Sequence, residues 1–128
     1  MTSAMVCLDT NYLVRTLVPD SEEFRRVAGW FHNGIELCTS SIAWYEFLCG
    51  PVSDNGARIV RALLSGGVIG FDTEQADKAA RLFNDVGRNR RLKFDAMIAA
   101  SAMCVGAQLA TGNRDDFLPF VPFGLSLA

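Results

Sequence analysis

The sequence is poor in the side chains that most often hold transition metals. Its one histidine is His32, and its four cysteines, Cys7, Cys38, Cys49 and Cys104, are scattered without any C-x-x-C pair. Zinc sites use such residues at short spacing, so we expect no zinc centre. Scattered cysteines in apolar segments behave as small buried hydrophobes, which is usual in a reducing compartment. We therefore expect a cytoplasmic protein.

Several motifs that carry common enzyme chemistries are also missing. The sequence has no G-x-S-x-G serine setting, no phosphate-cradling glycine loop and no G-x-G-x-x-G after an apolar run. Serine hydrolases, nucleoside triphosphatases and dinucleotide enzymes are disfavoured on this ground. The net charge of -2 gives no overall basic character, so a nucleic-acid partner would need a local patch. One basic cluster exists, and it is either a solvated helix end or such a patch: Arg81, Arg88, Arg90, Arg91 and Lys93.

Long apolar runs are absent as well. The longest weakly polar stretch, residues 96–110, contains Ser101, Gly106 and Gln108 and falls short of the roughly 20 apolar residues of a membrane span. The apolar run at residues 5–8 follows no basic residue and ends at Asp9, so we expect neither a signal peptide nor a membrane contact. A chain of 128 residues that is half hydrophobic fits a single globular domain over residues 1–128.

Short apolar runs alternate with helical stripes along the chain. The runs predict strands at residues 5–8, 35–38, 68–71 and 108–111, with a further edge strand within 120–127. The stripes predict helices at residues 11–18, about 24–31, from a cap at Thr39, Ser40 or Ser41 to 49, 55–64, 73–86 with Thr73 as cap, and 94–105. Residues 87–91 and 112–116 are expected to be loops. Strands separated by helices indicate an α/β fold: a three-layer sandwich with a short, mostly parallel central sheet flanked by helices.

Four acidic residues stand in apolar surroundings: Asp9, Glu46, Asp95 and Asp116. Asp9 follows one predicted strand and residues 111–116 follow another, and ligands of parallel sheets bind beyond the carboxyl ends of strands. Carboxylates that gather there repel one another and favour a hard divalent cation such as Mg²⁺ or Mn²⁺. Each acid has a plainer alternative, since Asp caps helices and forms turns and Glu46 could face water. Asn11 and Thr111 are either hydrogen-bonding residues beside the acids or ordinary turn residues.

Four segments, taken in order, carry a resemblance: Val6-Cys7-Leu8-Asp9-Thr10-Asn11, the helix with Glu46 after Ser40-Ser41, Phe94-Asp95-Ala96-Met97-Ile98-Ala99-Ala100, and Leu109-Ala110-Thr111-Gly112-Asn113-Arg114-Asp115-Asp116-Phe117. They resemble the PIN-domain ribonucleases, and most of all the VapC-type toxins of bacterial toxin–antitoxin pairs. The resemblance spans nearly the whole chain.

The resemblance implies a PIN-like fold and an endoribonuclease that depends on Mg²⁺ or Mn²⁺. It also implies a small antitoxin partner and a homodimer. Asp9, Glu46 and Asp95 match the family's acidic positions. Asn113 is neutral where some relatives carry the fourth acid, so Asp116 is expected in that role, with Asp115 as a substitute. The basic residues expected to steer the RNA substrate are Arg88, Arg90, Arg91 and Lys93.

Two rival functions remain open at this point. An aspartyl-phosphate phosphatase would use Asp9 as its nucleophile, but that chemistry wants a second acid where Asn11 stands. A non-catalytic module would keep the fold and bind a partner through its surface. Apolar faces within residues 24–31 and 42–48 are either docking surfaces for an antitoxin or parts of the core. The sequence leaves open the RNA that is cleaved, the antitoxin, and whether one or two ions bind.

Overall fold

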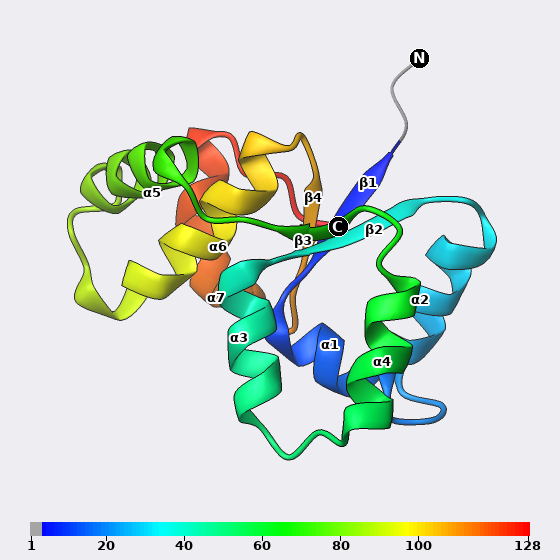
Figure 1. Cartoon of the computed structure of the whole chain (residues 1–128). Coiled ribbons are helices and arrows are strands. Elements are labelled where there is room, and N and C mark those ends of the chain that lie inside the picture. Colours follow the sequence, from blue (N-terminus) through cyan, green and yellow to red (C-terminus); the bar gives the residue numbers. More distant parts are fainter. Residues whose placement is uncertain (1–3) are drawn as a thin grey trace.

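The computed structural model describes residues 4–128, and its centre is a parallel four-stranded sheet. The strands are β1 (Met5–Leu8), β2 (Glu36–Ser40), β3 (Gly67–Ile69) and β4 (Gln108–Ala110), in the spatial order β3-β2-β1-β4 (Figure 1). Every neighbouring pair runs parallel, with Cys7 of β1 opposite Cys38 of β2 and Leu109 of β4. The expected parallel sheet is confirmed. Its central strand is buried from Val6 to Leu8, as strands covered on both faces must be.

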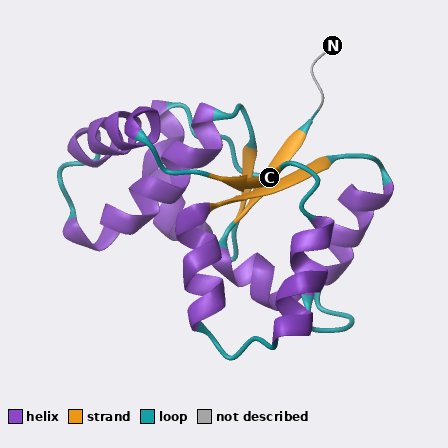
Figure 2. Cartoon of the chain, viewed as in Figure 1, coloured by secondary structure: helices purple, strands orange, loops and turns teal. Residues whose placement is uncertain are grey.

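Helices cover both faces of this sheet (Figures 1 and 2). Helices α1, α2 and α4 lie on one side, and α5, α6 and α7 lie on the other. Helix α3 contacts both α1 and α6, so it joins the two layers at one end of the sheet. The three-layer α/β sandwich is therefore confirmed. The helices are α1 (Thr10–Thr16), α2 (Glu22–His32), α3 (Ser41–Cys49), α4 (Asp54–Leu63), α5 (Thr73–Asp85), α6 (Lys93–Cys104) and α7 (Arg114–Phe117), with 3-10 turns η1 (Arg90–Leu92) and η2 (Leu118–Phe123).

The direction in which successive strands are added to the sheet reverses between β1 and β4. From β1 the chain moves through α1 and α2 to β2, and then through α3 and α4 to β3, always away from β4. From β3 it crosses to the opposite edge as β4, through α5 and α6 of the other layer. The loops after β1 and β4 therefore leave their strands toward opposite layers, which is the kind of switch point at which α/β proteins bind ligands.

Helix α6 forms the core of its layer because small side chains let it approach the sheet closely. Ala96, Ala99, Ala100 and Ala102 are buried, and Ile98 is buried with them. The buried part of α6 begins after Phe94, which is 66% exposed near the start of the helix. Among residues 4–128, no helix combines the length and apolar character that a membrane span requires.

Two predictions about the C-terminal part of the chain were wrong. The expected edge strand in residues 120–127 is the 3-10 turn η2, followed by a single parallel bridge between Leu109 and Leu127. Pro119 at the start of η2 fixes a turn-compatible φ, and Pro122 has no N–H to give a ladder. The second half of the expected loop at 112–116 belongs to α7, because Phe117 is fully buried and anchors a helical turn there.

Two smaller differences concern the ends of helices α5 and α6. Helix α5 is capped by Asp72 rather than by Thr73. The Asp72 carboxylate accepts a hydrogen bond from the Glu74 N–H at 3.0 Å, and the Gln75 side chain accepts one from the Asp72 N–H at 3.2 Å. This reciprocal pair is a capping box, which satisfies two backbone donors at once. The expected loop at 87–91 ends in η1, which leads directly into α6.

Candidate metal-binding site

Asp9 lies where β1 ends, and two donors fix its carboxylate. Its Oδ1 accepts a hydrogen bond from the Thr10 N–H at 2.8 Å, which makes Asp9 the N-cap of α1, and its Oδ2 accepts one from the Thr111 hydroxyl at 2.7 Å. The side chain is 5% exposed. Burial raises the pKa of Asp9, the two hydrogen bonds oppose that shift, and the charges of Glu46 and Asp116 add to it. Asp9 is thus a helix cap and a buried carboxylate together.

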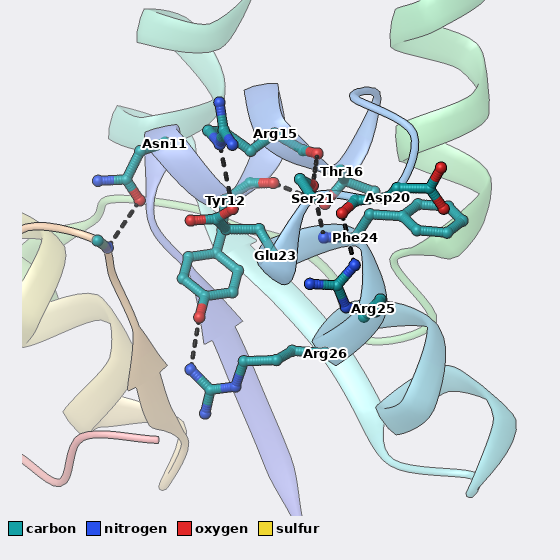
Figure 3. Close-up of polar contacts among 11 residues, drawn as sticks. Asn11, Tyr12, Arg15, Thr16, Asp20, Ser21, Glu23, Phe24, Arg25 and Arg26 are labelled. Atoms are coloured by element: carbon teal, nitrogen blue, oxygen red, sulfur yellow. Dashed lines mark hydrogen bonds and ion pairs between the residues drawn. The ribbon is translucent and has the colours of Figure 1, made fainter.

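The loop after β4 is tied to the loop after β1 through Thr111 and Asn11. The Thr111 hydroxyl, while donating to Asp9, accepts a hydrogen bond from the Asn113 N–H at 3.0 Å. The Gly112 N–H donates to Asn11 Oδ1 at 3.0 Å, the contact drawn beside Asn11 in Figure 3. A Cβ on Gly112 would lie 3.2 Å from Asn11 Nδ2, so any larger residue would push the Asn11 side chain away by a few tenths of an ångström. Both residues therefore connect the two loops, and Asn113 has a turn role.

Helix α1 is held against α2 by polar contacts that Figure 3 displays. The Tyr12 hydroxyl accepts a hydrogen bond from Arg26, whose guanidinium lies 4.7 Å from the centre of the Trp30 ring. Arg15 pairs with Glu23 at 3.1 Å on the surface. Because Asp9 begins α1, these contacts fix the direction in which the helix N-terminus and its capping carboxylate point.

Glu46 and Asp95 reach the same place from α3 and α6. Glu46 is exposed, and its Oε1 accepts a hydrogen bond from the Thr10 hydroxyl at 3.1 Å. Asp95 lies in the first turn of α6 and is partly buried. Burial raises the pKa of Asp95 to about 6, with further contributions from the charges of Asp9, Asp116 and Glu46. The three other acids thus act on Asp95, although they come from distant parts of the sequence.

Asp116, rather than its neighbour Asp115, is the acid of the last motif that faces the group. The charge of Asp116 is among the main causes of the raised pKa values of Asp9 and Asp95, whereas Asp115 is exposed. Asp116 Oδ1 accepts a hydrogen bond from Arg91 Nη1 at 2.8 Å. A polar hollow of about 290 Å³ next to this carboxylate is lined by residues 112–116.

The Arg91–Asp116 ion pair is the feature that sequence reasoning missed. The sequence grouped Arg91 with three other basic residues as a surface patch, and all four are exposed: Arg88, Arg90, Arg91 and Lys93. Arg91 lies four residues before Asp95, on the turn that begins α6, so its closeness to the acids was open to inference. Nothing in its spacing indicated that it pairs with an acid of the last motif.

The donor chemistry of this group fits a hard divalent cation, with one qualification from geometry. Among residues 4–128, no three Asp, Glu, His or Cys side chains converge closely enough to hold a metal ion between them as they lie. Three of the carboxylates instead accept hydrogen bonds from protein groups: Asp9 from Thr111, Glu46 from Thr10 and Asp116 from Arg91. Mg²⁺ keeps several waters and needs only one or two carboxylates, so a set of oxygen donors around buried Asp9 suits it.

A family model described as the PIN domain matches residues 6–119. The chain belongs to the PIN-domain family. Solved structures with the same fold include a toxin–antitoxin complex from Klebsiella pneumoniae, which is 26% identical, with a TM-score of 0.69 and 91% of each chain covered. No curated protein matches the sequence closely enough to count as a relative.

Two further PIN-fold structures are more distant in sequence and cover almost all of the chain. VapBC-1 from nontypeable Haemophilus influenzae is 18% identical, with a TM-score of 0.72 and coverage of 97% of this chain and 96% of its own. FitAcB from Neisseria gonorrhoeae is 20% identical, with a TM-score of 0.71 and 96% coverage of each chain. At these identities the likeness shows the fold. The sequence-based assignment to the PIN domains, with the fold of VapC-type proteins, is confirmed.

Proposed function

We propose that this PIN domain is an endoribonuclease that depends on Mg²⁺ or Mn²⁺ and acts as the toxin of a toxin–antitoxin pair. The observation that carries the proposal is the geometry around buried Asp9: Thr111 donates to its carboxylate at 2.7 Å, and the next residue, Thr10, donates to Glu46 at 3.1 Å. Burial and the charges of Asp9, Asp116 and Glu46 raise the pKa of Asp95 to about 6, which supports the same grouping. A protein gains nothing structural from holding four acids together at neutral pH, because their repulsion destabilises the fold. A divalent cation relieves that repulsion.

The contacts of each residue in the site indicate its proposed role. Asp9 and Asp95 are the best candidates to hold an ion, because Asp9 is buried, Asp95 is partly buried, and both match acidic positions of the resemblance. Thr111 orients the Asp9 carboxylate, and Thr10 orients Glu46. When bound, a divalent ion supplies a positive charge that acidifies a water nucleophile and offsets charge building on the phosphodiester. A nearby carboxylate such as Glu46 accepts the proton.

RNA is the proposed substrate, and the exposed basic residues before α6 are proposed to contact its backbone. Arg88, Arg90 and Lys93 lie on the segment that leads to Asp95, so they flank the acids on the side of α6. Exposed cations of this kind bind phosphates without reading the base sequence. The net charge of the whole chain is -2, so binding depends on this local patch.

The proposal is tested by RNA cleavage with matched pairs of acid variants. Purified wild-type protein should cleave RNA when Mg²⁺ or Mn²⁺ is added and stop when the ion is chelated. Asp9→Asn and Asp95→Asn should each abolish cleavage, and Asp116→Asn should slow it. Asp115→Asn changes an adjacent, exposed acid and should leave the rate unchanged. Cleavage that persists in both Asp9→Asn and Asp95→Asn, once contaminating nuclease is excluded, would refute the assignment.

A cognate antitoxin is the proposed protein partner. The similar structure from Klebsiella pneumoniae is a toxin–antitoxin complex. This chain exposes apolar side chains on the two faces that the sequence singled out: Phe24 and Phe31 on α2 are 40% and 47% exposed, and Tyr45 and Leu48 on α3 are 70% and 47% exposed. Val27 on α2 and Phe47 on α3 are buried in the core. Each of these helices therefore carries core side chains as well as exposed apolar side chains that an antitoxin could contact.

The partner can be sought genetically. Expression of the chain alone should arrest bacterial growth, and co-expression with a short upstream gene for a DNA-binding protein should relieve the arrest. Leu48→Glu should then weaken the rescue without changing RNA cleavage by the purified toxin. A homodimer and a cytoplasmic location remain predictions from the resemblance and the composition.

A further inference from the structure

Arg91 differs from the other basic residues before α6 because its guanidinium is turned toward the acids. Its Nη1 donates to Asp116 Oδ1 at 2.8 Å, and the two side chains are 70% and 34% exposed. The backbone of Arg91 is fixed independently of this pair. Asn89 Oδ1 accepts a hydrogen bond from the Arg91 N–H at 3.1 Å, and Leu92, 3% exposed, anchors η1 in the core. The fold therefore presents Arg91 to the site from a rigid turn.

This guanidinium opposes the mutual repulsion of the carboxylates. Burial and three neighbouring acids favour the neutral form of Asp95, and Arg91 is the cation that counteracts them. A divalent ion near Asp116 would do the same with twice the charge. The ion and the guanidinium cannot both sit against one carboxylate without repelling each other at short range. Arg91 therefore lies where it would compete with a metal ion for the Asp116 carboxylate.

We propose that Arg91 is a built-in counter-ion, which holds Asp116 in the metal-free chain and is displaced from Asp116 when a divalent ion binds. The proposal deepens the proposed function and rests on the same metal site. Arg91 is in this account a positioning residue. Because competition for one carboxylate is reciprocal, removing the guanidinium must strengthen metal binding, and that gain must depend on Asp116.

The test measures binding of Mn²⁺ alone, by the loss of the free-ion signal in electron paramagnetic resonance, with no RNA present. Arg91→Met should bind Mn²⁺ about two- to fivefold more tightly than wild type, the effect expected for losing an exposed ion pair. Arg90→Met is the matched control, because it removes the same charge from the same turn. Among residues 4–128, Arg90 forms no ion pair. In an Asp116→Asn background, Arg91→Met should give no comparable gain.

Three results would overturn the proposal. Wild type could bind Mn²⁺ while Arg91→Met binds it equally well or less tightly, which would leave the nuclease assignment standing. Arg90→Met could give the same gain as Arg91→Met, which would reduce the effect to net charge. The gain could also persist in the Asp116→Asn background. If neither wild type nor any variant binds Mn²⁺, the metal-dependent function fails together with the counter-ion.

Discussion

Replacing Asp95 with asparagine should make the metal-free protein more stable at neutral pH, although it should destroy the activity proposed for the site. In the folded chain the pKa of Asp95 is raised from 3.8 to about 6. The folded state therefore binds a proton that the unfolded state has already released between about pH 4 and pH 6. The stabilisation from this proton is complete below pH 3.8 and is lost as the pH rises through 6. At pH 7.5 the ionised carboxylate destabilises the folded state, and an uncharged asparagine removes this destabilisation.

The size of this effect follows from the shift and from the exposure of Asp95. A shift of about two pKa units corresponds to roughly 3 kcal/mol at full strength. Asp95 is only partly buried, and solvent screens its interactions with the other acids. We therefore expect Asp95→Asn to raise the free energy of unfolding by about 1 to 2 kcal/mol at pH 7.5, and by much less at pH 4.5.

Urea unfolding in the presence of a chelator, followed at pH 4.5, 6 and 7.5, measures this difference directly. Asp115→Asn is the matched control, because it changes an exposed acid nearby and should shift stability at no pH. Adding Mg²⁺ should stabilise wild type and leave Asp95→Asn unchanged, since an ion that binds only the folded site stabilises by mass action. A variant that is less stable than wild type at pH 7.5, or a difference that does not depend on pH, would refute the reasoning.

Two substitutions test how the loops after β1 and β4 hold the site. Thr111→Val keeps the shape but removes the donor 2.7 Å from Asp9 Oδ2, so urea unfolding at pH 7.5 should show a loss of about 1 to 3 kcal/mol; an unchanged midpoint would mean that water replaces the hydroxyl. Gly112→Ala places a Cβ 3.2 Å from Asn11 Nδ2 and should cost about 1 kcal/mol in the same assay. Gly112→Ala should also slow RNA cleavage, whereas Gly29→Ala, which meets open space, should leave the rate unchanged.

The sheet and most helices could be predicted because local chemistry and tertiary packing agree there. Ser40, one of the three expected caps, begins α3 through its hydroxyl, and Ser21 caps α2 in the same way. The C-terminal segment could not be predicted in this way. Its apolar residues suit a strand or a turn equally, and Phe117 and Phe120, both fully buried, decide in favour of helical turns that pack them into the core.

The candidate site was predictable to the extent that it depends on strand ends. Asp9 and Thr111 follow strands that turned out to be neighbours, and Thr111 donates to Asp9 across 102 positions of sequence. Glu46 and Asp95 lie on helices, where only tertiary packing decides which way a side chain points. The resemblance supplied their positions, and the contacts of α3 with α1 and α6 explain why Glu46 reaches Thr10.

The ion pair of Arg91 and Asp116 marks the limit of what spacing can reveal. An exposed arginine in a basic run carries no local signal for its partner, because a long side chain can pair with any acid within its reach. Arg91 pairs with Asp116 because η1 and α7 bring the two side chains together. Asn89 and Leu92 orient η1, and buried Phe117 holds α7 in place. Both turns lie outside the helices and strands that the hydrophobic pattern predicts. The ion pair is thus set by two short segments whose conformations the core determines.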